Sequence, residues 1–317
     1  MSLQELGLTL NEFKWLESWQ KKLQSPSDPD LIMGLGDDAA VCRVNKDQTI
    51  LLATDMLCQG VHFEDQEDPY MVGRKALAVN LSDIAAMAGQ PQWALVALAL
   101  PTNYQKSYAD QIMQGISDLA KSYDVSVVGG DTTRSRQDLC VAVSIFGQAL
   151  EKGPVFRKGA RLGDAIMVTG SLGGSLASGT HLSFTPRVKE ALFLKAHYSI
   201  HAMMDLSDGL AQDLRQLITQ SDCGALLFPH KIPICKSLHE LDHNTQLRRA
   251  LCDGEDFELI FTLPKKEAFD LEKKLLPTQC PVSIVGEIIE EKGLYWKTPL
   301  KTLQPIHWRG YEHCWDS

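Results

Sequence analysis

The chain has 317 residues, of which 44% are hydrophobic and 22% charged, a composition typical of a globular protein with a sizeable core. Acidic residues outnumber lysine and arginine by 40 to 31, and the net charge of −9 disfavours nucleic acid as a partner. The longest apolar run, Trp93 to Leu100, is far shorter than the roughly 18 residues that a membrane span requires. Because the N-terminus shows no signal-peptide pattern, we expect a soluble, cytoplasmic protein with no membrane partner.

The predicted elements alternate along the chain. A packing helix is predicted over residues 11–23, with Asn11 as its N-cap. From residue 48 onward, short β-rich runs alternate with helical patterns, which is typical of α/β or α+β architecture. A polar segment rich in glycine, residues 151–163, marks a domain boundary near residue 150. Strands are predicted at residues 50–53, 94–100, 125–128, 139–146, 165–169, 225–228, 257–263 and 282–285.

One predicted helix carries a carboxylate in an apolar setting. Asp68 and Pro69 form a good N-cap and first position, and Gly89 ends the pattern, so the helix covers most of residues 70–88. Asp83 lies in this helix, the most apolar of the chain. A buried carboxylate there would need a proton, a hydrogen-bonding partner or a metal. An exposed Asp83 on the outer face of the helix is the equally weighted alternative.

Acidic residues recur where predicted strands end. In α/β architectures such ends carry the ligand site, and oxygen ligands gathered from several segments suit Mg²⁺. Clustered carboxylates repel one another unless cations neutralise them, and metals held this way usually bridge to substrate phosphates. A single aspartate in a loop is more often a turn former, but five such places, counting Asp83, favour a magnesium site. The other carboxylates are Asp37, Asp38, Asp55, Asp131, Asp205 and Asp208.

Two glycine-rich segments are candidate phosphate-binding turns. Gly129 and Gly130 precede Asp131 and let backbone N–H groups approach an anion closely. Residues 170–174 lie between a strand and a predicted helix and could do likewise, although ordinary tight turning is the favoured explanation. The sequence contains no G-x-x-x-x-G-K-[ST] pattern, so a nucleotide would not bind through a Walker loop.

A zinc-protease pattern is interpreted as a coincidence. Residues 239–243 satisfy H-E-x-x-H, which can place two zinc ligands on one face of a helix. The flanking residues 236–249 are polar, whereas a catalytic zinc helix lies inside a core, and no third histidine follows at the metzincin spacing. The eight cysteines are scattered singly, without zinc-ligand spacing. Zinc hydrolysis is therefore disfavoured.

Six segments carry a resemblance to a known family. They are GDDAAV (36–41), TDMLCQGVHF (54–63), KALAVNLSDIAAMAG (75–89), GGDTTR (129–134), DLSDGL (205–210) and GEDFEL (254–259). In this order and approximate spacing they resemble the thiamine-monophosphate kinase family. The resemblance spans nearly the whole chain and implies a two-domain, aminoimidazole ribonucleotide synthetase-like α/β (α+β) fold. It implies an N-terminal domain, residues 1–150, that binds ATP and magnesium and contributes to a dimeric β-barrel. The C-terminal domain, residues 151–317, would close the active site.

The resemblance also implies an activity. A kinase of this family transfers the γ-phosphoryl group of ATP directly to the phosphate of thiamine monophosphate, with several Mg²⁺ ions and no side-chain nucleophile. The implied partners are these two substrates and a second copy of the chain. Matching positions imply magnesium ligands at Asp38, Thr54, Asp55, Asp83, Asp131, Asp205 and Asp208, ATP contacts at Gly130, Asp131, Arg157 and Ser207, and thiamine-phosphate contacts at His62, Glu255 and Trp308.

Three alternatives to these implied roles are weighed. Trp308 alone is better explained as a core aromatic residue. Another ATP-using synthetase of the superfamily is disfavoured by the tail at residues 308–311 and the segment at residues 60–63, which resemble the thiamine family in particular. A non-catalytic sensor of thiamine phosphates would be expected to have lost acidic ligands, and none is lost.

Overall fold

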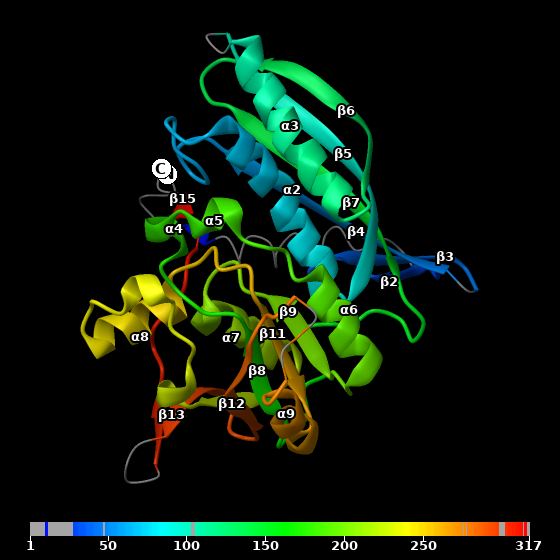
Figure 1. Ribbon diagram of the computed structural model, residues 1–317. Coiled ribbons are helices and arrows are strands. Elements are labelled where there is room, and N and C mark those ends of the chain that lie inside the picture. Colours follow the sequence, from blue (N-terminus) through cyan, green and yellow to red (C-terminus); the bar gives the residue numbers. More distant parts are fainter. Residues whose placement is uncertain are drawn as a thin grey trace, which may run out of the picture.

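The computed structural model describes residues 10–11, 28–46, 48–102, 105–274, 276, 278–297, 302–312 and 314–315. Over these residues each half of the chain forms one mixed sheet with its own helices (Figure 1). The helix predicted over residues 11–23 lies outside the described residues, except for Asn11, which pairs in β1 (Leu10–Asn11) with β15 (Cys314–Trp315). In the part of the chain that the structure describes, no helix combines the length and apolarity needed to cross a membrane.

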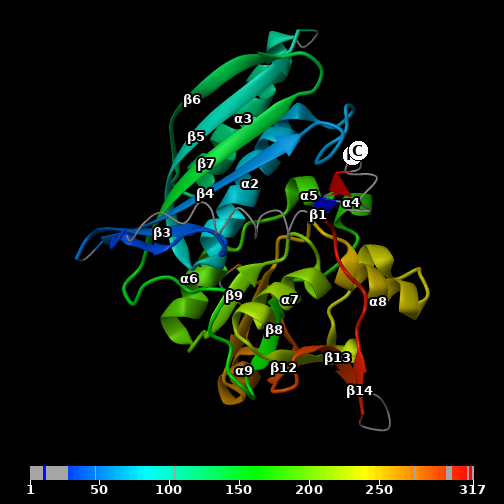
Figure 2. The same ribbon diagram turned by 180° about the vertical axis from the view of Figure 1, so that it is seen from behind.

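The N-terminal half forms a sheet of six described strands, in the spatial order β2-β3-β4-β7-β5-β6. The pair β5/β6 is parallel and the other pairs are antiparallel. Helices α2 (Pro69–Ala86) and α3 (Lys106–Ser122) cover one face, and Figure 2 shows no described helix on the opposite, outer face. The strands are β2 (Leu31–Met33), β3 (Ala40–Asn45), β4 (Gln48–Cys58), β5 (Gly89–Pro101), β6 (Ser126–Ser135) and β7 (Cys140–Ala149).

Two of these strands run further than the sequence predicts. The run that was expected to end at residue 53 continues to the end of β4, and the run at residues 125–128 continues through β6. Asp55 and Asp131 therefore lie inside strands, and the prediction that they stand at strand ends is wrong. The continuation has a physical reason, because β6 is an exposed edge strand and β4 sends only alternate side chains into the core.

Helix α2 is the central element of the molecule and begins as predicted. The Asp68 carboxylate accepts a hydrogen bond from the backbone N–H of Tyr70 at 2.9 Å, and Pro69 is the first helical residue. Of its 18 residues, 13 are buried. A helix that is apolar on all sides must be covered on all sides. Helix α2 packs against the first sheet, α3, α5 (Thr180–Ser183), α6 (Val188–His197) and β9 (Ala202–Asp205).

The C-terminal half forms a sheet of seven described strands, in the order β14-β13-β10-β12-β8-β11-β9. Its faces join two different cores: Met203 of β9 packs into the core that contains α2, whereas Met204 packs against α7 and α8. The strands are β8 (Ala165–Thr169), β9 (Ala202–Asp205), β10 (Gly224–Leu227), β11 (Leu259–Leu263), β12 (Val282–Ile289), β13 (Gly293–Lys297) and β14 (Leu303–Pro305). The helices are α4 (Ser175–Ser178), α5 (Thr180–Ser183), α6 (Val188–His197), α7 (Leu210–Gln220), α8 (His243–Cys252) and α9 (Lys265–Leu271), with 3-10 turns η2 (Pro229–Lys231) and η3 (Lys236–Leu238).

Candidate active site

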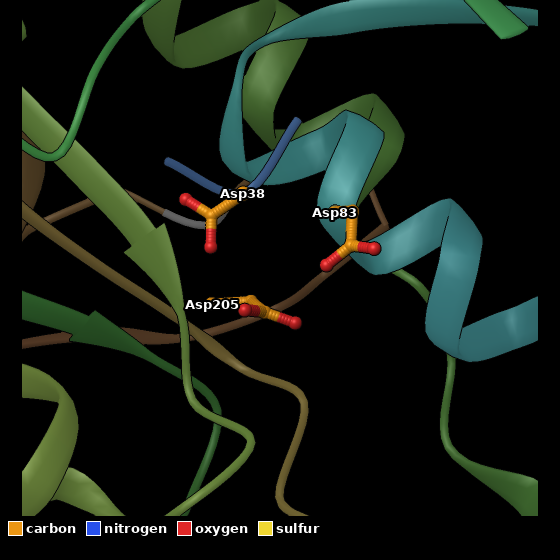
Figure 3. Close-up of side chains that lie close together, drawn as sticks. All are labelled: Asp38, Asp83 and Asp205. Carbon is orange, nitrogen blue, oxygen red and sulfur yellow. The ribbon is translucent and has the colours of Figure 1, made fainter. Parts of the chain in front are cut away.

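Three aspartates from distant parts of the chain point toward one another where the two halves meet (Figure 3). Asp38 lies between β2 and β3, Asp83 lies near the end of α2, and Asp205 is the last residue of β9. One carboxylate oxygen of each lies within 4.8 Å of the others. We call these three residues the acidic cluster. Asp38 and Asp205 are buried, and Asp83 is half-buried.

The alternation of β9 and the packing of α2 explain how the cluster forms. Met203 packs in the core that contains α2, so Asp205, two residues further along the strand, points to the same side. The hydroxyl of Ser82 in α2 donates a hydrogen bond to Asp205 Oδ2 at 2.6 Å and holds that carboxylate in place. Asp83 follows Ser82 and faces the cluster, so the alternative of a solvent-facing Asp83 on the outer side of the helix does not hold.

Asp55 adds a fourth carboxylate, from the inner face of β4. Its backbone N–H donates to Asn80 Oδ1 at 3.2 Å. Burial raises the pKa of Asp55, and a hydrogen bond with Asp83 offsets part of that rise. Burial and then repulsion from Asp55, Asp205 and Asp38 raise the pKa of Asp83 well above its ordinary value. The pKa of Asp205 rises to about 8, first through burial and then through Asp38. Asp205 therefore retains its proton near neutral pH unless a cation replaces it, and the same burial and repulsion favour the protonated forms of Asp55 and Asp83.

The donor set of the acidic cluster fits a hard divalent cation. Asp38 Oδ2 is buried and has no hydrogen-bond partner among the described residues. Carboxylate oxygens are the ligands that Mg²⁺ prefers, and its charge would offset the repulsion among them. No second group of three or more His, Cys, Asp or Glu side chains with this spacing occurs in the described parts of the chain.

Arg157 supplies positive charge beside the cluster and comes from the C-terminal half. Its Nη2 donates to Asp38 Oδ1 at 2.6 Å, and its Nη1 donates to Gln216 Oε1 at 2.8 Å. Burial opposes the charge of this guanidinium, but the carboxylates of Asp38, Asp37 and Asp205 together outweigh burial and raise the pKa of Arg157 overall. The backbone N–H of Arg157 also donates to the carboxylate of Asp37, whose pKa rises to about 7 through burial and then Asp38.

A buried lysine joins two of the predicted substrate residues. Lys75 of α2 is fully buried, and its Nζ donates to the backbone carbonyl of His62 at 2.7 Å and to the carboxylate of Glu255. The His62 ring accepts the backbone N–H of Cys58 at 3.0 Å through Nδ1, which orients it. The His62 carbonyl and the Glu255 carboxylate thus both accept hydrogen bonds from one ammonium group. Lys75 is not among the residues predicted from the sequence, although a charged residue inside an otherwise apolar helix was the available signal.

The loop after β9 connects the remaining predicted residues. The Ser207 carbonyl accepts the backbone N–H of Glu255 at 2.7 Å, and the Asp208 carbonyl accepts the backbone N–H of Tyr311 at 2.9 Å. Trp308 is half-buried against the second core, edge-on to Trp296 with ring centroids 6.2 Å apart. The loop therefore borders both the Glu255 segment and the tail, and Trp308 packs in this structure as the core-aromatic alternative describes.

Three predicted site residues lie away from the cluster in a single chain. Thr54 precedes Asp55 in β4, so its side chain points to the outer face of the sheet. Gly130 and Asp131 are exposed in β6, and a Cβ at Gly130 would lie 1.7 Å from a carbonyl oxygen of β5, which is why glycine is needed there. Asp131 shares a cross-strand row with Met56 of β4, three strand spacings or about 14 Å away.

Comparison with known proteins decides the family. The description "AIR synthase related protein" matches this chain twice, with its N-terminal domain over residues 36–149 and its C-terminal domain over residues 161–297. The thiamine-monophosphate kinase of Rhodopirellula baltica is 38% identical, over 90% of this chain and 92% of that protein. The chain belongs to the thiamine-monophosphate kinase family.

Further members of the thiamine-monophosphate kinase family agree over almost the full length. The Escherichia coli K12 protein is 32% identical over 96% of this chain and 99% of its own. The structure of AaThiL complexed with AMPPCP and TMP is 29% identical over 98% of both chains, with a TM-score of 0.81. The resemblance and the two-domain α/β fold are therefore confirmed. The dimeric barrel, the separate roles of residues 1–150 and 151–317 and the cytoplasmic location remain predictions.

In this member of the thiamine-monophosphate kinase family, the backbone N–H groups of the glycine-rich turn at residues 170–174 donate to carboxylates of the same chain. The N–H of Gly173 donates to the Asp256 carboxylate at 2.8 and 3.0 Å, and the N–H of Gly174 donates to Asp253 Oδ2 at 3.0 Å. Internal carboxylates thus occupy the donors that a phosphate would need. The turn has a structural role, as the tight-turn explanation expects.

The histidines of the zinc-protease pattern do not share a helix. His243 is the first residue of α8, Asp242 caps that helix, and His239 precedes both after the 3-10 turn η3. Both histidines are exposed. A zinc-protease site needs its two histidines one turn apart on one helical face. The structure therefore provides no such pair at residues 239–243.

Proposed function

We propose that this protein transfers the γ-phosphoryl group of ATP to the phosphate of thiamine monophosphate, giving thiamine diphosphate and ADP. The observation that carries this proposal is the acidic cluster, assembled from three distant segments in a chain of this kinase family. The similarity to AaThiL, which is complexed with AMPPCP and TMP, supports the two substrates. Because the acceptor is already an anionic phosphate, the main tasks of the protein are positioning and charge neutralisation.

The acidic cluster and Asp55 are proposed to hold several magnesium ions. Asp208, in the loop that follows β9, is proposed as a further ligand. Bound Mg²⁺ would neutralise the charge that the two phosphate-bearing substrates bring together and align a direct in-line transfer. The remaining roles belong to the chain itself. Arg157 lies beside Asp38, where its planar guanidinium suits pairing with a phosphate. Gly130 and Ser207 are proposed to contact the nucleotide, and His62, Glu255 and Trp308 the thiamine phosphate.

A homodimer is proposed to bring Asp131 to the site. The outer face of the first sheet exposes large apolar side chains, including Met56 at 56%, Trp93 at 47% and Leu95 at 37%. Large apolar side chains exposed on one face of a sheet favour association. Thr54 and Asp131 lie on the same face as Met56. We therefore propose that two sheets pack through this face, and that Asp131 of the partner subunit reaches the acidic cluster.

The activity is tested by measuring ADP release with ATP and Mg²⁺, using thiamine monophosphate or free thiamine as the acceptor. We expect Mg²⁺-dependent release with thiamine monophosphate and little with free thiamine, together with formation of thiamine diphosphate. Absence of release with both acceptors, or release with free thiamine alone, would overturn the proposed function.

The contribution from a second copy is tested by subunit complementation. Asp83→Asn and Asp131→Asn are each expected to be inactive when pure. If Asp131 acts across the dimer, mixed dimers contain one site with both aspartates intact, and random exchange restores about a quarter of the wild-type activity. If Asp131 acts within its own chain, no mixed site has both residues and the mixture stays inactive.

A further inference from the structure

Lys75 occupies an unusual position among the charged groups of the molecule. Its side chain is 0% exposed, and it lies on α2 in the N-terminal half, whereas its partner Glu255 belongs to the C-terminal half and is 20% exposed. A fully buried ammonium group is costly unless hydrogen bonds and an opposite charge compensate it. Lys75 has both, through the His62 carbonyl and the Glu255 carboxylate. Burial of this charge therefore depends on the two halves meeting at this point.

The backbone at Glu255 adds a second observation. Glu255 has φ of 68° and Phe257 has φ of 47°, both in the left-handed region that side chains other than glycine rarely adopt. The surroundings hold this strained segment: the N–H groups of Glu255 and Phe257 donate to the carbonyls of Ser207 and Leu206 at 2.7 and 2.8 Å. The Phe257 ring also stacks on Phe184 with centroids 4.3 Å apart. Strain retained in this way is typical of functional segments.

The ion pair leaves one side of Glu255 available. Lys75 contacts Oε2, and none of the described residues forms a hydrogen bond with the other oxygen, Oε1. The direction of Oε1 is thus set by the hydrogen-bonded backbone of Glu255 and by the ammonium group of Lys75. The backbone carbonyl of His62, the second proposed substrate residue, accepts a hydrogen bond from the same ammonium group.

We propose that Lys75 is a positioning residue of the thiamine-phosphate subsite. Its ammonium group holds the Glu255 carboxylate and the turn that carries His62 in one arrangement across the contact between the two halves. It acts through these two residues rather than by touching the reacting phosphates. This inference rests on the proposed function and deepens it, because it names what orients the acceptor site.

Lys75 could instead serve only to hold the two halves together, and another ion pair between the halves provides a control for that role. Oε1 of Glu67, in the N-terminal half, lies 3.4 Å from Nε2 of His181 in α5, so Glu67 too bridges the halves. Its other oxygen accepts the backbone N–H of Glu64 at 3.0 Å, whereas Lys75 bonds to His62 and Glu255. If the bridge alone mattered, Glu67→Gln would affect the enzyme as Lys75→Met does. If positioning matters, the two variants differ in substrate kinetics.

The test compares wild type, Lys75→Met, Glu255→Gln, the double variant and Glu67→Gln, with KM measured for thiamine monophosphate and for ATP. We expect Lys75→Met to raise KM for thiamine monophosphate at least about tenfold while KM for ATP changes less than about twofold. In the Glu255→Gln background the same change is expected to add less than about threefold, because the group that Lys75 positions is already altered. Glu67→Gln is expected to leave both KM values within about twofold.

Equal rises in the two KM values, or the same loss from Lys75→Met with and without the Glu255 carboxylate, would overturn the positioning role. Thermal unfolding monitors the fold of each variant. If Lys75→Met does not fold, Lys75→Gln serves instead, since it keeps N–H donors while it removes the positive charge, and the same selective rise in KM is required of it. Wild-type turnover is measured in parallel, so a failure of the proposed function itself appears there and not in the variants.

Discussion

Replacing Asp83 by asparagine should separate the stability of the protein from its activity, because Asp83 is crowded by two other carboxylates. Oxygens of Asp38, Asp83 and Asp205 lie within 4.8 Å of one another. Two unit charges at that distance repel by about 3 kcal/mol at an effective dielectric constant of about 20. Protonation already relieves part of this repulsion, so Asp83→Asn is expected to stabilise the metal-free protein by about 1–3 kcal/mol.

The assay is thermal and denaturant unfolding, first with a chelator and then with rising MgCl₂, alongside the ADP-release assay. Wild type should gain about 2.7 kcal/mol when Mg²⁺ exceeds its dissociation constant a hundredfold. The variant should gain much less, and its turnover should fall by at least about a hundredfold. Asp110→Asn, in the exposed part of α3, is the matched control and should behave as wild type.

The reasoning would be refuted by a metal-free Asp83→Asn protein that is no more stable than wild type. It would equally be refuted by a variant that keeps the full Mg²⁺-dependent gain in stability. Either result would mean that the carboxylate of Asp83 is neither repelled by its neighbours nor used to hold a cation.

Three further predictions concern other parts of the chain. Arg157→Gln leaves the buried Asp38 carboxylate without its ion pair, so the free energy of unfolding should fall by about 3 kcal/mol. The KM for ATP should rise at least about tenfold. An unchanged KM for ATP would remove Arg157 from the nucleotide subsite. Burial raises the pKa of Asp256 from 3.8 to about 7, so the folded state holds a proton that the unfolded chain releases. Wild type should therefore lose stability relative to Asp256→Asn as the pH rises from about 4 to about 7, and parallel curves of Tm against pH would contradict this. His239→Ala combined with His243→Ala should leave turnover within about twofold, and the purified protein should contain no stoichiometric zinc by metal analysis.

Local signals predicted local structure well. The start of α2 follows from Asp68 and Pro69, whose effects act within one turn, and the prediction of this helix is confirmed. The ends of β4 and β6 could not be predicted in the same way. Both strands continue through polar and glycine residues because neighbouring strands supply hydrogen bonds, and that pairing is a long-range property.

The candidate site was only partly readable from the sequence. The spacing of Asp83 within an apolar helix suggested burial, but its contact with Asp38 and Asp205 depends on how α2 packs against β9. The role of Lys75 could not be predicted from the sequence, because its partner Glu255 is 180 residues away along the chain. The assignments of the metal, nucleotide and substrate residues remain predictions. Asp131 lies on an outer sheet face, so its proposed role requires a second copy of the chain, and the order of residues in one chain cannot show this.

The alternation of β4 limits how this protein can change in length. Thr54 and Met56 face outward, where association is proposed, while Asp55 faces α2 and the carboxylates. Inserting or deleting one residue upstream within the strand would exchange the two sets, exposing the carboxylate and burying a hydroxyl in its place. Evolutionary gain or loss of single residues should therefore be confined to the connections on either side of β4, because one such event within it would damage catalysis and assembly together.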